Sequence, residues 1–332
     1  MNLKEKDIRP EKLRKKQQKF LQQDINFLKK NKKNFHKVNC PACDNKSSIF
    51  FLEKKTFQYR TCTKCKTFYM SPRPNNKLLE VFYNHSLNVK FWNNYMFPLT
   101  DKIRAKKIFK PRVKKIIEIS KNFKLKNPSI LDVGAGFGTF CKESKKTKFF
   151  SRITAIEASK AGAENCKKNG IEVFHGMVEN ISNLKKKYDI VTSFEVIEHL
   201  YSIKDYIKKI KKFIKPNGIL IITCPNGDGF DVRYLLKNSD TIDHEHLNYF
   251  NPDSIVVALK KLKLEVKEIF TPGKLDLDIV KNTLKNKKIT TTPNYFFNKL
   301  IFSENKKLSN NFQKFLVVNN LSSNMWVVAK FK

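Results

Sequence analysis

The chain has 332 residues, of which 40% are hydrophobic, and a formal net charge of +37. This length and apolar content support a sizeable core and exclude a disordered protein, and the lack of any apolar run of about 18 residues excludes a transmembrane helix. Only eight of the 67 basic residues are Arg. Because proteins that read phosphates and bases rely on the bidentate Arg fork, the composition argues against a nucleic-acid partner, although the charge attracts anionic ligands of any kind.

The N-terminal region is basic and carries no apolar signal-peptide segment. Residues 1–36 are rich in Lys and Gln, and Leu21, Ile25 and Leu28 recur at helical spacing. This pattern predicts either an amphipathic helix or a flexible tail. The chain has seven cysteines, an odd number, which fits a reducing compartment better than a disulfide framework. We therefore expect a soluble, cytoplasmic protein.

A cysteine module follows at residues 37–72. Cys40 and Cys43 form one CxxC pair, Cys62 and Cys65 form a second, and the eighteen residues between the pairs give a spacing typical of zinc sites. Four thiolates complete a tetrahedral set and leave no open position, so the zinc would be structural. The intervening residues alternate enough for a hairpin, which predicts a zinc ribbon; the alternative is four unliganded or redox thiols.

The next two regions have different periodicities. Residues 73–126 hold several aromatic residues in a helical pattern and predict a helical linker. Residues 127–332 read as an α/β domain, because four apolar runs each break into Gly, Pro or acid at the end where open α/β sheets collect ligand-binding groups. The run MWVVAKF at 325–331 predicts a late strand that returns to the sheet, and the spacer at about 271–320 predicts an insertion. The four runs are ILDVGAGFGTF at 130–140, ITAIEAS at 153–159, FEVIEHL at 194–200 and KPNGILIITCPN at 215–226.

The Gly-rich turn Gly134-Ala-Gly136-Phe-Gly138 indicates a nucleotide cofactor. A dinucleotide fold uses GxGxxG with a helix N-terminus aimed at a pyrophosphate. Here Asp132 precedes the turn and would repel a phosphate, whereas it suits an ammonium group. Glu157 ends the next run and can accept hydrogen bonds from ribose hydroxyls. S-adenosylmethionine combines an ammonium group with a ribose and has no phosphate, so it is the predicted cofactor.

These motifs, in this order, resemble those of the class I S-adenosylmethionine-dependent methyltransferases. The resemblance implies a Rossmann-like, seven-stranded α/β sheet with helices on both faces and an antiparallel last strand, which MWVVAKF would supply. It also implies that the turn residues line the methionine end of the cofactor, that Glu157 binds the ribose, and that Met177 lies against the adenine. The implied cofactor-binding residues are Asp132, Gly134, Gly136, Gly138, Glu157, Met177 and Glu195.

A cysteine module followed by this core also resembles the sugar C-methyltransferases and related enzymes of surface-polysaccharide loci. The resemblance implies methylation of a sugar, either nucleotide-linked or part of a glycan precursor. A Glu-His pair lies at the sugar site of those enzymes, with His as the base, and here it matches Glu198 and His199. His246, and less strongly His244, could contribute to the same pocket. This chain is shorter than typical sugar C-methyltransferases.

Three alternatives use the same residues. Glu195, Glu198, His199 and His246 could hold a divalent metal, as in the RNA 3′-terminal ribose methyltransferases, which carry a similar ExxEH pattern. ExxEH also occurs in small-molecule O-methyltransferases. A third hypothesis is that the protein is a non-enzymatic zinc-ribbon adaptor whose methyltransferase core has lost its activity. The intact Gly-rich turn and Asp132 argue against this hypothesis.

Overall fold

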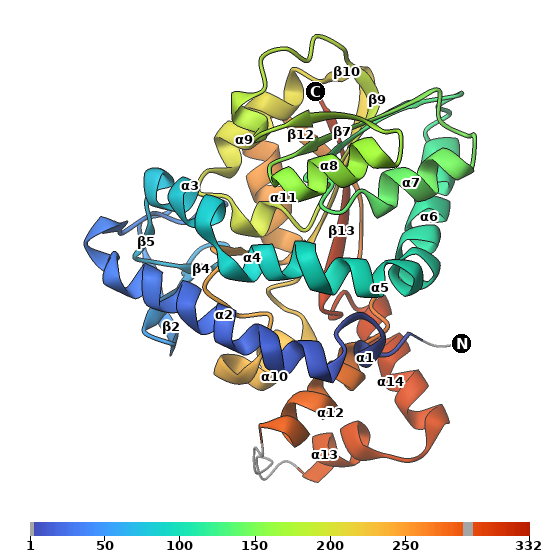
Figure 1. Ribbon diagram of the computed structural model, residues 1–332. Coiled ribbons are helices and arrows are strands. Elements are labelled where there is room, and N and C mark those ends of the chain that lie inside the picture. Colours follow the sequence, from blue (N-terminus) through green and yellow to red (C-terminus); the bar gives the residue numbers. More distant parts are fainter. Residues whose placement is uncertain (1–2, 288–294) are drawn as a thin grey trace.

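A seven-stranded mixed sheet forms the centre of the structure, a computed structural model that describes residues 3–287 and 295–332 (Figure 1). Its order is β12-β13-β10-β9-β6-β7-β8. The strands from β8 to β10 run parallel, and β13 is antiparallel to both its neighbours. The predicted sheet and its antiparallel last strand are therefore confirmed. The strands are β6 (Ser129–Val133), β7 (Arg152–Glu157), β8 (Glu172–His175), β9 (Tyr188–Phe194), β10 (Ile214–Pro225), β12 (Leu264–Phe270) and β13 (Asn324–Phe331).

Helices cover both faces of this sheet because neighbouring side chains of each strand point in opposite directions. Leu131 of β6 packs in a cluster with α9 (Ile203–Lys211) and α11 (Pro252–Lys261). Its neighbour Ile130 packs in a second cluster with helices of the opposite layer. The result is a three-layer α/β/α sandwich. The helices of the opposite layer are α6 (Lys110–Asn122), α7 (Thr139–Lys146) and α8 (Lys160–Lys168).

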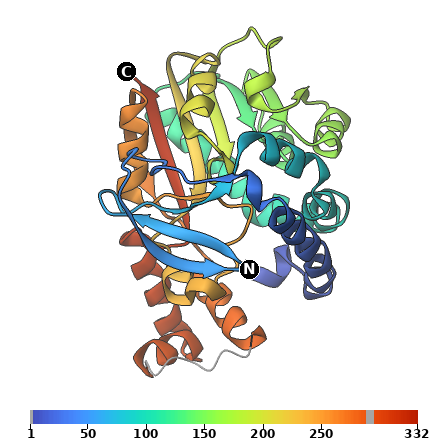
Figure 2. The ribbon, with the colours of Figure 1, turned by 90° about the vertical axis from the view of Figure 1, so that its left-hand side faces the viewer.

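A second, four-stranded sheet is built on the cysteine module, whose own strands are light blue in Figure 2. The expected hairpin is present, with β2 (Ser48–Lys54) paired to β3 (Phe57–Cys62). Next come β4 (Phe68–Met70) and then β11 (Asn248–Tyr249), which arrives from almost 180 residues away in sequence. Sequence reasoning did not anticipate β11. Its pairing ties the cysteine module to the α/β sandwich, and a short pair, β1 (Phe35–His36) with β5 (Arg73–Pro74), flanks the module.

The N-terminal region is helical over α1 (Glu5–Ile8) and α2 (Glu11–Lys30), which selects the helix over the flexible tail. The amphipathic face of α2 buries Ile25 and Leu28 as the periodicity indicated. The predicted linker is also helical. It comprises α3 (Asn76–His85), α4 (Leu87–Phe91), α5 (Phe97–Arg104) and α6, with π-helical turns at Trp92–Met96 and Ala105–Phe109.

Much of the predicted insertion is helical as well. It contains α12 (Asp276–Asn286), α13 (Tyr295–Phe302) and α14 (Lys306–Val318), which pack with α10 (Phe230–Leu235) around a small apolar cluster. Residues 288–294 of the insertion lie outside the described residues. In the described ranges no helix is both long enough and apolar enough to span a bilayer.

The Asp24 side chain joins the N-terminal helix to the linker, and this contact can be tested. The buried Asp24 carboxylate accepts hydrogen bonds from the Ser86 hydroxyl and the Leu87 and Asn88 amides at the start of α4. We expect Asp24→Ala to lower the free energy of unfolding by about 2 kcal/mol or more, since each buried donor left unpaired costs about 1–3 kcal/mol. Urea unfolding measures this, with the exposed Glu11→Ala as control; equal values for both variants would contradict the assignment.

Candidate active site

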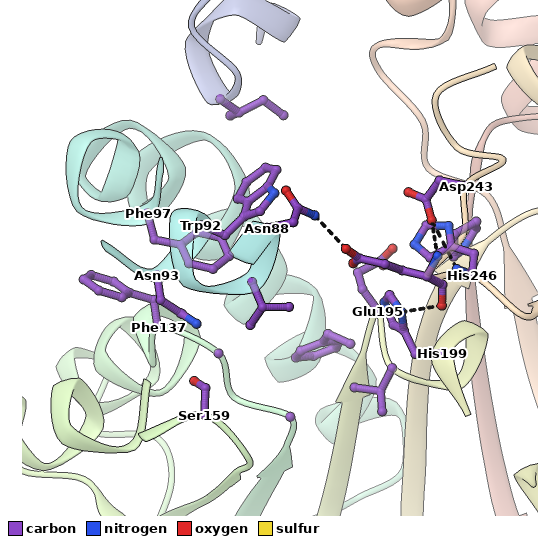
Figure 3. A pocket seen from close by; sticks show the side chains of 18 of the residues that line it. Asn88, Trp92, Asn93, Phe97, Phe137, Ser159, Glu195, His199, Asp243 and His246 are labelled. Carbon is purple, nitrogen blue, oxygen red and sulfur yellow. Dashed lines mark hydrogen bonds between the residues drawn. The ribbon is translucent and has the colours of Figure 1, made fainter. Parts of the chain in front are cut away.

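One large cleft opens at the carboxyl ends of the parallel strands. Its volume is about 2840 Å³, whereas a pocket for one ligand typically measures about 300–1,000 Å³. The cleft therefore has room for two ligands side by side. Figure 3 shows Trp92, Phe97 and Phe137 on one side and His199 and His246 on the other. The first side corresponds to the predicted cofactor end.

The Gly-rich turn forms part of the cofactor end, and its glycines differ in role. Gly134 and Gly136 line the cleft with φ values of +80° and +56°, a conformation that L side chains rarely adopt. A Cβ on Gly134 would also lie 2.5 Å from Val196 Cγ2. Gly138 has a φ of +73° as well, and a Cβ there would also lie 2.6 Å from Cys166 Sγ, so glycine permits close helix packing at this position. All three glycines of the turn therefore have a left-handed backbone, and Gly138 has a packing requirement in addition.

Asp132 and Glu157 lie on the cleft wall at the ends of β6 and β7. Burial raises the pKa of Asp132 to about 6, although its Oδ1 accepts a hydrogen bond of 2.8 Å from Thr192 Oγ1. The Glu157 carboxylate accepts hydrogen bonds from the Gly136 and Ser159 amides, and burial raises its pKa. Each Glu157 oxygen keeps a second lone pair able to accept a further hydrogen bond, and the residue lines the cleft.

Arg112 of α6 completes this end of the cleft and was missed from sequence. Its guanidinium stacks over Phe194, 4.4 Å from the ring centroid, and the acids that act on it electrostatically are Glu195 and Asp132. It makes no hydrogen bond or ion pair within residues 3–287 and 295–332, so its planar donors are free for a ligand. The cofactor end therefore presents both an acidic and a basic group.

Met177 and Glu195 also line the cleft. Met177 is partly exposed beside β8, where an adenine ring could contact its thioether. Glu195 has a φ of +55°, a strained conformation of the kind that clusters at functional sites. Its Oε1 accepts hydrogen bonds from Thr223 Oγ1 and Asn324 Nδ2, which fix the side chain.

The other end of the cleft brings three of the predicted residues together. Glu198, His199 and His246 each offer one ligand atom, and these atoms lie within 4.8 Å of one another. Glu198 is 1% exposed, and its Oε2 has no hydrogen-bond partner in the described structure. Burial, reinforced by the charge of Glu195, raises the pKa of Glu198 well above its usual value. A cation would supply the partner that this oxygen lacks.

Both imidazoles of this histidine cluster are held in one tautomer. His199 Nδ1 lies 3.0 Å from the Glu245 carbonyl, and His246 Nδ1 lies 2.8 Å from the Thr241 carbonyl. Because a carbonyl oxygen only accepts, each Nδ1 must carry a proton, which leaves each Nε2 as the ring atom that could act as a metal ligand. Burial lowers the pKa of His199 to about 3, which keeps its ring neutral. Two imidazoles tethered at Nδ1 beside a carboxylate form a set of metal-ligand type.

The remaining predicted residues do not join this cluster. The Glu195 carboxylate is engaged by Thr223 and Asn324. The His244 ring is buried between Phe57 and Phe82. Sequence reasoning weighted His244 below His246, and the structure places the two rings in different environments.

Asn88 and Glu245 lie between the two ends of the cleft and were also missed. Asn88 Nδ2 donates to Glu245 Oε1 at 2.6 Å, the bond drawn from Asn88 in Figure 3, and Gln17 Nε2 donates to Asn88 Oδ1. All three line the cleft. The spacing of these residues gave no signal, because they come from three distant segments. Arg112 could have been noticed as one of only eight arginines.

The four cysteines of the module gather at one point. Cys40 Sγ lies 3.4 Å from Cys65 Sγ, and Cys43 Sγ lies 3.5 Å from Cys62 Sγ. All four sulfurs lie within 4.8 Å of one another, whereas zinc with bonds of about 2.3 Å places tetrahedral sulfurs roughly 3.8 Å apart. This donor set fits a structural zinc ion.

Comparison with known proteins gives the family. A family model described as "Methyltransferase domain" matches residues 102–269. Among curated proteins, the chain is 32% identical over 211 residues to a protein of Rickettsia prowazekii named ubiquinone biosynthesis O-methyltransferase, a match that spans 59% of this chain and 80% of the relative. A protein of the same name from Rickettsia conorii is 31% identical over 153 residues, or 42% of this chain and 52% of that one. The cysteine module precedes the segment that the family model matches.

Two solved structures were also matched. One is an S-adenosylmethionine-dependent methyltransferase from Clostridium acetobutylicum, with 13% identity, coverage of 72% of this chain and 98% of that chain, and a TM-score of 0.47. The other is coclaurine N-methyltransferase bound to N-methylheliamine and SAH, with 14% identity, coverage of 66% and 72%, and a TM-score of 0.43.

Proposed function

Because the chain belongs to the class I S-adenosylmethionine-dependent methyltransferases, we propose that it methylates a hydroxyl oxygen of a small molecule that carries a second oxygen beside it. The acceptor would lie at the histidine cluster, formed by Glu198, His199 and His246. One observation carries the proposal: two imidazoles, each tethered at Nδ1 by a backbone carbonyl, present free Nε2 atoms beside a buried carboxylate.

The cofactor end suits the charges of S-adenosylmethionine, which supplies the methyl group when bound. Its methionine part is a zwitterion, and here Asp132 and Glu195 would receive the ammonium group while Arg112 would receive the carboxylate. Glu157 would bind the ribose through its remaining lone pairs. The aromatic residues Trp92, Phe97 and Phe137 would cover the bound cofactor and exclude water.

The histidine cluster suits a divalent cation. A cation held there would polarise the acceptor hydroxyl and favour loss of its proton to water, so that the oxygen could take the methyl group from the sulfonium and leave S-adenosylhomocysteine. It would also favour an acceptor with two adjacent oxygens. The sequence hypothesis made His199 a general base, but a ring with a pKa of about 3 takes up a proton weakly, and the same neutrality suits a ligand. The wall between the two ends, formed by Asn88 and Glu245, would hydrogen-bond the acceptor and hold it in line with the methyl group.

The identity of the acceptor rests on two lines of support. The relatives are named O-methyltransferases, which favours a small-molecule acceptor and oxygen as the methylated atom. A nucleotide-linked sugar or glycan precursor, the hypothesis from sequence, is the second candidate. It is favoured by basic side chains along the cleft, among them Arg14, Lys55 and Lys274, which suit a phosphorylated acceptor.

We further propose that Cys40, Cys43, Cys62 and Cys65 hold one structural zinc ion. Their sulfurs lie within 4.8 Å of one another, close enough to share one ion, and all seven cysteines of the chain are free of disulfides. Free thiols suit a reducing compartment such as the cytoplasm.

The role of Arg112 can be tested by cofactor binding. Arg112→Met should weaken the binding of S-adenosylhomocysteine roughly 10- to 100-fold, because hydrogen bonds to charged groups contribute about 1.5–3 kcal/mol. Isothermal titration calorimetry measures the affinity, and Arg152→Met, at an exposed position, is the control. Equal affinity for S-adenosylhomocysteine in both variants would show that Arg112 does not bind the cofactor.

The cation site can be tested by chelation and by substitution. EDTA should abolish methyl transfer, and Mg²⁺ or Mn²⁺ should restore it. His246→Ala should reduce kcat/KM at least about 100-fold, since loss of even an outer partner of a metal ligand costs about 10- to 100-fold. The matched control is His85→Ala, an exposed histidine of α3. Full activity in EDTA would contradict a catalytic divalent cation and favour the hypothesis that His199 is a general base.

The acceptor class can be identified by radiolabelled methyl transfer. We expect labelling of catechol-type or sugar-diol acceptors, and much weaker labelling of the matched compounds in which one of the two hydroxyls is removed. Asn88→Ala should raise KM for the acceptor while the affinity for S-adenosylhomocysteine stays within about twofold of wild type. Labelling of RNA 3′ ends in preference to every small molecule would overturn the proposed acceptor class.

A further inference from the structure

The segment 239–249 carries His246, and the cysteine module holds it at several points. Lys54, at the end of β2, donates to the Ser239 and Ile242 carbonyls. Tyr59 of β3, which is fully buried, donates from its hydroxyl to the Asp243 carbonyl at 2.7 Å. The strands of the module therefore bind the first half of the segment.

The second half of the segment is part of the module's own sheet. Tyr249 pairs with Phe68 across β11 and β4, and the two rings stack with centroids 4.2 Å apart. Met70 N donates to the Leu247 carbonyl at 3.0 Å. His246 thus lies inside a segment whose two ends are both fixed by the cysteine module.

Hydrogen bonds within segment 239–249 connect these anchored residues to the His246 ring. The Asp243 side chain accepts from the Glu245 and His246 amides, which sets the turn. The Tyr249 hydroxyl donates to the Thr241 carbonyl, the same carbonyl that fixes His246 Nδ1. Displacement of Asp243 or Tyr249 would therefore rotate the imidazole.

The same segment also reaches the other two members of the histidine cluster. Leu247 N donates to the Glu198 carbonyl at 2.7 Å, and the Glu245 carbonyl tethers His199 Nδ1. Arg73, just after the module, donates to Asn248 Oδ1, and Asn248 in turn donates to the Leu200 carbonyl. All three residues of the cluster are oriented through segment 239–249.

We propose that the cysteine module is the positioning element of the acceptor site, so that metal loading at the four cysteines preorganises the histidine cluster through segment 239–249. The inference rests on the proposed function, because it takes the histidine cluster as the cation and acceptor site. Tyr59 does not line the cleft and is a positioning residue, whereas Lys54 both holds the segment and lines the cleft. At the cofactor end, Asp132, Glu157 and Arg112 come from β6, β7 and α6. We therefore expect cofactor affinity not to depend on the hydrogen bonds between the module and segment 239–249.

The test compares Tyr59→Phe with Tyr69→Phe. Tyr69 is an equally buried tyrosine of β4; its backbone pairs with Asn248, but its hydroxyl has no hydrogen-bond partner in the described residues, so its loss leaves the segment's hydrogen bonds intact. Tyr59→Phe should weaken Mn²⁺ binding at the histidine cluster and lower kcat, each about tenfold or more. Zinc content should stay at one equivalent and the affinity for S-adenosylhomocysteine within about twofold. Tyr69→Phe should match wild type in all four measurements.

A second variant links the effect to the cysteine metal. Cys65→Ser should lose zinc and lose at least as much Mn²⁺ affinity as Tyr59→Phe, while it still binds S-adenosylhomocysteine. Wild-type Mn²⁺ affinity in a zinc-depleted or Tyr59→Phe protein would overturn the positioning role alone. Failure of the wild-type protein to bind Mn²⁺ at all would instead overturn the proposed function and the inference with it.

Discussion

The hydrogen bond from Leu247 N to the Glu198 carbonyl joins the two loops on which the acceptor end of the cleft depends. One loop follows β9 and carries Glu198 and His199. The other belongs to segment 239–249 and carries His246. Neither loop alone has two tethered imidazoles beside a buried carboxylate. The chemistry proposed for the site therefore requires that the two loops keep their relative positions. The second sheet, through β11, keeps them there.

Electrostatics divides the cleft into two parts. At the cofactor end, a buried guanidinium faces two carboxylates, an arrangement that suits a zwitterion and disfavours a pyrophosphate. At the acceptor end, a buried carboxyl oxygen that has no partner in the described structure adjoins two imidazoles, an arrangement that suits a cation. The large positive charge of the chain is therefore a poor guide to the site itself. Its lysines give the protein a positive surface, whereas a few buried groups decide what the cleft binds.

Sequence periodicity and turn chemistry predicted the central sheet, the late strand, the hairpin and the cofactor-binding turn, because each depends on residues that are close in sequence. They also placed His199 and His246 in one pocket. Arg112, Asn88 and Glu245 were missed, since Arg112 reaches Phe194 and Asn88 reaches Glu245 only when distant segments fold together, and local spacing gives no sign of such contacts. β11 was missed for the same reason: two residues are too few to show an alternating pattern, and their pairing with β4 is decided by tertiary contacts such as the stack of Tyr249 on Phe68. Gly138 fitted the motif, and part of its need for glycine comes from a contact with Cys166 that the motif does not show.

We propose that the cleft holds a divalent cation between Glu198, His199 and His246. Its most direct test is anomalous X-ray diffraction at the manganese edge from crystals of the protein with S-adenosylhomocysteine and Mn²⁺. We expect one manganese peak within bonding distance of the two Nε2 atoms and the Glu198 carboxylate. Clear density for the cofactor product with no manganese peak among these three side chains would contradict it.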